Sequence, residues 1–158
     1  MKLSLVVADA GRPGSSGNIS LLNAGWTFTT ATPVDPPDQG WLLPAQAVCV
    51  FLASDWDELN RTHKLVVELM NEDGEIAQLS QGPGNFEDAR IEHDMAIPSI
   101  AGAPNGTPGR ASFLVDIPGG GIRVPRAPGW YKWRATIGST TAEVGFWVNT
   151  LPTPPKVG

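Results

Sequence analysis

The chain has 158 residues, of which 41% are apolar and 17% charged, so it can bury the core of one folded domain. Its formal net charge of −5 argues against a general nucleic-acid-binding protein, because neutralising phosphates requires an excess of basic residues. No apolar run is long enough to cross a membrane, and the single cysteine, Cys49, excludes a disulfide within the chain.

The 18 glycines and 15 prolines come in short clusters between apolar runs, which is typical of the turns of a many-stranded β-protein. We therefore expect an all-β fold: an antiparallel β-sandwich, immunoglobulin-like or jelly-roll-like, with roughly nine strands. One domain should span residues 1–148. Residues 149–158 contain three prolines and predict an extended C-terminal arm of polyproline type.

The N-terminal segment Lys2 to Asp9 predicts the first strand. It imitates a signal peptide, but its apolar run is shorter than the roughly seven to fifteen residues that such a peptide needs, so we do not expect secretion by a signal peptide. A flexible turn at Gly11 to Gly17 follows, and Asn18 to Thr30 predicts a second strand with a bend at Ala24 and Gly25. The segment Ala31 to Gly40 contains three prolines, which lack an N–H donor, so we expect it to cross one end of the sandwich.

The segment Ala45 to Ala53 is apolar on both faces and rich in valine, which predicts a central strand. Cys49 lies within it and should be a buried, inert thiol. The next stretch, Ser54 to Thr62, predicts a single helical turn capped by Ser54 or Asp55.

The central part of the chain predicts further strands with half-buried patterns. His63 to Asn71 alternates between apolar and polar residues, and the pair Asp73 and Gly74 predicts a tight hairpin to a returning strand at Ile76 to Gln81. Ala89 to Pro98 and Ala111 to Ile117 predict two more strands.

The clearest pattern lies between Pro128 and Val148, where two alternating stretches flank a polar connector and predict a β-hairpin. Because side chains alternate between the faces of a strand, one face is apolar and belongs to the core; it includes Tyr131, a candidate tyrosine corner. The opposite face has a mixture of large aromatic and charged groups that a purely solvated surface rarely needs. These are Trp130, Lys132, Arg134, Glu143 and Trp147.

The sequence offers no catalytic, metal or cofactor motif. His63 and His93 lie in different predicted strands without ligands at a fixed spacing, and the acidic loops around Asp55 and Asp73 do not fit a twelve-residue calcium loop. Gly119 to Gly121 lacks the Lys and Ser or Thr of a phosphate-binding loop. We expect a protein that is not an enzyme and that holds no cofactor or metal.

We interpret the outer face of the last hairpin as a protein-contact surface, because tryptophan and arginine are enriched at binding hot spots. Two alternatives stay open: the proline-rich arm could cover a tryptophan, or single-stranded nucleic acid could stack there, against which the acidic net charge argues. The contact residues proposed from the sequence are Trp130, Lys132, Arg134 and Trp147, with the basic neighbours Arg123 and Arg126.

Five short stretches resemble an uncharacterised family of small β-sandwich proteins from actinobacteria and their bacteriophages: Val7 to Ala10, Ala24 to Trp26, Asn60 to Lys64, Glu72 to Gly74 and Pro128 to Arg134. The likeness runs over most of Leu5 to Val148. It implies a sandwich fold and no known activity, so no catalytic residue is carried over. The segments Gly11 to Gly17 and Ser99 to Gly109 look longer than the family's turns and would add contact loops.

The resemblance leads us to expect a non-enzymatic virion structural protein, in first place a bacteriophage capsid decoration or accessory protein assembled in the host cytoplasm. Its partners would be other virion proteins and copies of itself, because acidic early loops and the basic segment Arg123 to Arg134 favour head-to-tail contacts between copies. A phage tail component is the near alternative, and a soluble bacterial module that binds a ligand or a protein is the alternative from another class.

Overall fold

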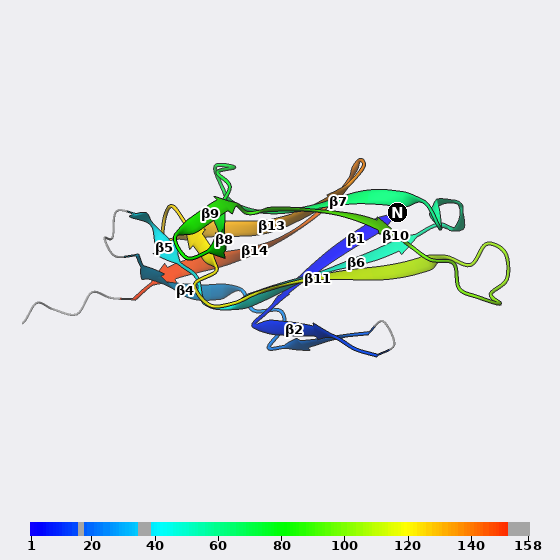
Figure 1. Ribbon diagram of the computed structural model, residues 1–158, viewed down its shortest axis with the longest axis horizontal. Coiled ribbons are helices and arrows are strands. Elements are labelled where there is room, and N and C mark those ends of the chain that lie inside the picture. The colour runs from blue at the N-terminus through cyan, green and yellow to red at the C-terminus, as the bar shows by residue number, and fades with distance from the viewer. Residues whose placement is uncertain (16–17, 35–38, 152–158) are drawn as a thin grey trace, which may run out of the picture.

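Three β-sheets make up the part of the chain that the computed structural model describes, residues 1–15, 18–34 and 39–151. Figure 1 shows an elongated molecule whose long strands run along its major axis. The expected all-β sandwich is confirmed. The described residues form fourteen strands rather than roughly nine, because several strands are only two to four residues long and leave no alternation to detect.

The first sheet has three antiparallel strands in the order β1–β6–β11, with β1 (Lys2–Ala8), β6 (Gln46–Ser54) and β11 (Gly109–Ile117). The prediction of a central strand near Ala45 to Ala53 is confirmed by β6. Val48, Val50 and Leu52 of β6 join the main core, while Cys49 is fully buried on the other face of the strand.

The second sheet has nine strands and contains the predicted hairpin, now β13 and β14. All neighbours are antiparallel except β14 and β4, which are parallel. Its order is β10 (Arg90–Ala96), β7 (Thr62–Asn71), β13 (Gly129–Ile137), β14 (Thr140–Thr150), β4 (Phe28–Pro33), β5 (Trp41–Leu42), β12 (Ile122–Val124), β8 (Gln78–Gly82) and β9 (Asn85–Asp88).

This large sheet curls until its two ends meet at Ala89. The strand order begins with β10 and ends with β9, and only Ala89 separates these two strands in the chain. The Ala89 N–H donates to the Ala77 carbonyl at 2.7 Å, and the Ala89 carbonyl accepts the N–H of Leu69 at 3.0 Å. All three residues are completely buried, so the sheet closes around one end of the core.

A third layer lies against the three-stranded sheet. It is the hairpin of β2 (Ala10–Pro13) and β3 (Ile19–Leu22), which Figure 1 shows outside the sandwich next to β11. The approach is close at Gly11, where an added Cβ would lie 2.7 Å from Leu114 Cδ1. Leu114 is the register partner of Cys49, so the hairpin is placed against the face of the sheet that buries this cysteine.

Two hydrogen bonds fix the last hairpin in the core. The Tyr131 hydroxyl donates to the carbonyl of Arg126 at 2.7 Å, which is the geometry of a tyrosine corner in immunoglobulin-like sandwiches. The Trp133 indole N–H donates to the Gln46 side-chain oxygen at 2.9 Å and thereby links the two main sheets through a buried polar pair.

The early part of the chain departs from the sequence predictions. The expected bent strand Asn18 to Thr30 is wrong: β3 and β4 belong to different sheets, and Asn23 and Gly25 adopt positive φ angles of 49° and 81° between them. Residues 10–13 form β2 instead of a turn. An alternating pattern reports which residues share a face, but it does not reveal where the chain crosses between layers.

Other segments also differ from expectation. Ala31 to Pro33 were expected in an end loop but complete β4, whose Ala31 pairs with Thr150 and whose Pro33 pairs with Trp41. Pro33 is the last residue of β4 and lies beyond the pairing with β14, which ends at Ala31. The predicted helical turn is confirmed as a 3-10 turn at Trp56–Glu58, but Asp55 at its N-cap makes no side-chain capping bond.

The predicted C-terminal arm begins later than residue 149. Strand β14 continues to Thr150, so Asn149 and Thr150 belong to the sheet, and Leu151 follows with 62% of its surface exposed. The rest of the predicted arm, residues 152–158, lies outside the described residues.

Candidate protein-contact surface

Three aromatic side chains from three neighbouring strands lie together on the outer face of the nine-stranded sheet. Trp130 of β13 is paired in register with Trp147 of β14, and Trp147 is paired with Phe28 of β4. Residues directly opposite in neighbouring strands project from the same face. We call Phe28, Trp130 and Trp147 the aromatic patch.

The aromatic patch is more exposed than large apolar side chains usually are. Phe28 is 63% exposed and Trp130 is 50% exposed. Trp147 is half-buried, with its ring edge-on to Trp130 at a centroid distance of 5.4 Å and its indole N–H bonded to Asn149 Oδ1 at 2.9 Å. Edge-to-face packing and this hydrogen bond hold the Trp147 ring in place, so the patch is a fixed surface rather than three independent side chains.

The rest of the same face is covered by alternating charges, which we call the charge ladder: Lys132, Glu143, Arg134, Glu68, Arg90, Glu92 and Lys64. Glu143 accepts from Lys132 at 3.1 Å and from Arg134 Nε at 2.8 Å. Glu92 lies between Arg90 and Lys64, at 3.0 and 3.2 Å. Glu68 bonds Arg90 and is the register partner of Arg134, so cations and carboxylates alternate across this face.

The hydrogen bonds of the charge ladder lower the pKa of two of its carboxylates, Glu143 and Glu92. Bonds from Arg134 and Lys132 hold the pKa of Glu143 below its usual value, and bonds from Arg90 and Lys64 do the same for Glu92. Lys132 and Arg134, proposed from the sequence as contact residues, thus have intramolecular partners. They lie beside the aromatic patch and form its charged border.

Arg123 and Arg126, the other two residues proposed from the sequence, lie apart from this patch. The Arg123 guanidinium bonds Gln78 Oε1 at 2.6 and 2.8 Å and lies 4.2 Å from the centre of the Phe86 ring. Arg126 pairs with Glu75 at 2.8 Å in the β7–β8 turn. The sequence-predicted set therefore divides into four residues on one sheet face and two that lie elsewhere. Arg123 joins the short strands β12 and β8, and Arg126 pairs with the β7–β8 turn.

Phe28 was missed by sequence reasoning. The run Trp26, Thr27, Phe28 gave no sign of which face each residue would occupy, because its strand neighbour is 119 positions away at Trp147 and pairs in parallel. The sequence offered one signal, two aromatic residues two positions apart. The structure separates them, because Trp26 precedes β4 and packs edge-on against buried Phe146, whereas Phe28 is exposed.

The candidate metal ligands have ordinary structural roles. Asn71 Oδ1 accepts the backbone N–H groups of Asp73 and Glu75 at 3.0 and 2.9 Å and so shapes the turn that was considered for calcium. His93 stacks on Phe113 at 4.6 Å. Among the described residues, no three His, Cys, Asp or Glu side chains are grouped as metal ligands.

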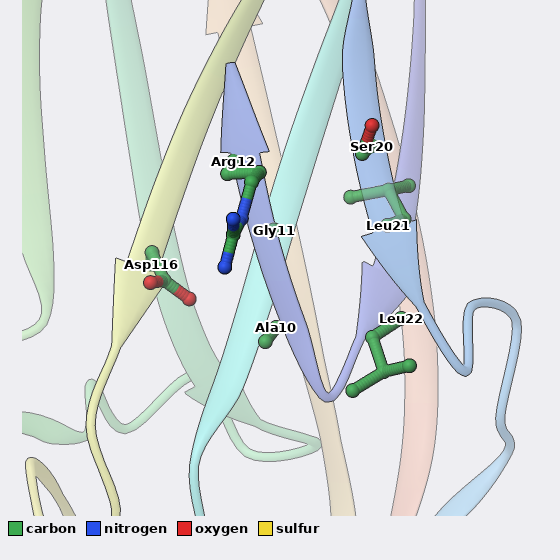
Figure 2. A pocket seen from close by; sticks show the side chains of 7 residues that line it. All are labelled: Ala10, Gly11, Arg12, Ser20, Leu21, Leu22 and Asp116. Atoms are coloured by element: carbon green, nitrogen blue, oxygen red, sulfur yellow. The ribbon is translucent and has the colours of Figure 1, made fainter. Parts of the chain in front are cut away.

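The surface also has open hollows. One of them has a volume of about 390 Å³. It lies between the β2–β3 hairpin and the end of β11, as Figure 2 shows. Its charged lining residues are Arg12 and Asp116, and apolar Leu21 and Leu22 line it from β3. It is a shallow depression with no set of convergent polar groups.

Within the described ranges, no helix is long and apolar enough to span a membrane. In comparisons with protein-family models and with curated proteins, nothing matches this chain.

Proposed function

We propose that this chain is a non-enzymatic structural protein of a bacteriophage particle, a capsid decoration or accessory protein, that binds another virion protein through the aromatic patch. The observation that carries the proposal is the exposure of Phe28 and Trp130 beside the ordered ring of Trp147. The resemblance of the sequence to small proteins of actinobacteria and their phages is the reason for placing that partner in a virion.

The patch has the features of a binding hot spot. Aromatic side chains lose little conformational entropy on binding and remove a large apolar area from water, which is why tryptophan is enriched at the centres of interfaces. The charge ladder beside the patch supplies a polar border. Its residues closest to the tryptophans along the strands are Lys132 in β13 and Glu143 in β14. An apolar centre with a charged border is the usual organisation of a specific protein interface.

The proposal is tested on particles that lack this protein, prepared from a phage genome with its gene deleted. Purified protein is added back, particles are separated from free protein on a density gradient, and bound copies are quantified by mass spectrometry. We expect the wild-type chain to bind, and Phe28→Ala and Trp130→Ala each to weaken binding by roughly tenfold or more, as truncation of a hot-spot residue does.

Trp56→Ala is the matched control, because Trp56 is also 63% exposed but lies in the 3-10 turn rather than in the patch. It should bind as the wild type does. Circular dichroism and thermal unfolding must show that all variants fold. Failure of the wild-type chain to sediment with particles would overturn the proposal, and binding to isolated tails instead of heads would identify a tail component.

A further inference from the structure

Strand β11 is a long, regular strand with an open edge. Its nine residues pair without a bulge with β6 on one side. On its other side, no backbone hydrogen bond joins it to any described residue. The opposite edge of the same sheet is partly covered, since Gly25 N–H donates to the carbonyl of Val7 in β1 at 2.7 Å. A free edge of this length is a template for strand addition.

We propose that β11 is the docking site for β11 of a second copy of this chain, paired antiparallel about a two-fold axis through Phe113. In this register Arg110 of one copy lies directly opposite Asp116 of the other, and the symmetry makes the pair twice. Both side chains are exposed, and neither forms an ion pair with another described residue. They are separated by an even number of positions and so share one face of the strand.

The charges select one register. Moving the pairing by one residue places Arg110 opposite Val115 or Ile117, and moving it by two places Arg110 opposite Leu114 or Pro118. Only the two-fold axis at Phe113 brings Arg110 and Asp116 together. At the two-fold axis, half-buried Phe113 of one copy lies opposite Phe113 of the other. Within each copy the His93 ring stacks on Phe113.

The edge of the other sheet shows the opposite pattern. Strand β10 ends the nine-stranded order, and self-pairing about its central residue, His93, would place Glu92 opposite Asp94, again twice. Like charges in directly opposed positions are destabilising. Edge strands are commonly protected by such charges, so β10 resists self-pairing whereas the charges of β11 favour it.

This inference does not depend on a virion. It concerns the three-stranded sheet, whereas the aromatic patch belongs to the nine-stranded sheet, so the two contacts can be lost separately. It differs from the head-to-tail contact expected from the sequence, because in an isologous contact both copies use the same surface and association stops at a dimer.

The test measures self-association of the purified full chain by analytical ultracentrifugation over a wide concentration range. We expect a dimer for the wild type. Arg110→Asp places two acids opposite each other at both ends of the β11–β11 pairing, and Asp116→Arg places two arginines there. Each substitution should weaken the dimer by about 10- to 100-fold, and the double variant R110D/D116R should restore it.

Mixing the two single variants is the sharpest arm of the experiment. In a heterodimer of R110D with D116R, both aspartates of one copy face arginines of the other. The mixture should therefore dimerise more tightly than either variant alone. Arg61→Asp, an equal charge change at an exposed residue outside β11, should leave dimerisation unchanged. A monomeric wild type at the highest concentration, or a mixture that stays monomeric, would refute the pairing.

Discussion

The buried thiol of Cys49 makes the stability of this protein fall at alkaline pH. Burial raises the pKa of Cys49 from 9.0 to about 11. Between these values the unfolded chain has released the thiol proton while the folded chain still holds it, so folding stability is fully present below pH 9 and declines as the pH rises toward 11. At about 1.36 kcal/mol for each tenfold change in proton affinity, the loss reaches about 2.7 kcal/mol.

Urea unfolding of the wild type and of Cys49→Ala, measured from pH 7 to pH 10.5, isolates this effect. The alanine variant should be less stable at neutral pH by about 1–2 kcal/mol, because it leaves a small cavity between β6 and the β2–β3 hairpin. The difference should shrink from pH 9 upward. Burial also raises the pKa of Tyr131, but this residue is present in both proteins and cancels. Two stability curves that stay parallel through pH 10 would refute the reasoning.

Two further substitutions test the fold. Gly40→Ala should lower the free energy of unfolding by about 3 kcal/mol or more, because Gly40 has a φ of 106° and an added Cβ would lie 2.7 Å from the Val124 carbonyl oxygen. Gly74→Ala, at a φ of 82° in open space, should lower it by about 1 kcal/mol. Equal losses in the urea midpoint would contradict this. Trp133→Phe should lower stability by roughly 2–4 kcal/mol in the same measurement, since it removes buried volume and leaves the Gln46 amide oxygen without its donor. A loss below about 1 kcal/mol would show that the hydrogen bond between Trp133 and Gln46 is dispensable.

Strands with a clean alternation were predictable from the sequence. The hairpin β13–β14 is the best case: the apolar residues from Tyr131 to Ile137 are buried in alternation, and Trp130 and Trp147 project together from the other face. The period of two fixes these assignments without knowledge of neighbouring strands. The corner role of Tyr131 also follows from its place at the start of such a strand.

Short strands and cross-sheet neighbours were not predictable in the same way. Strand β5 has two residues and β12 has three, and both exist because β4 and β8 offer backbone groups to them. The charge ladder has the same origin. Arg90 meets Glu68 only because β10 and β7 pair in a particular register, which no local pattern specifies.

The two halves of the outer face would respond differently to a partner. Covering the charge ladder would remove seven charges from water, and exposed ion pairs of this kind gain too little to offset that cost. Covering Phe28 and Trp130 removes apolar surface from water and is favourable. A partner that binds this face would therefore be favoured over β4, β13 and β14, where the aromatic patch lies and exposed Leu151 follows the last strand. The charge ladder would limit how far along the face such a contact extends.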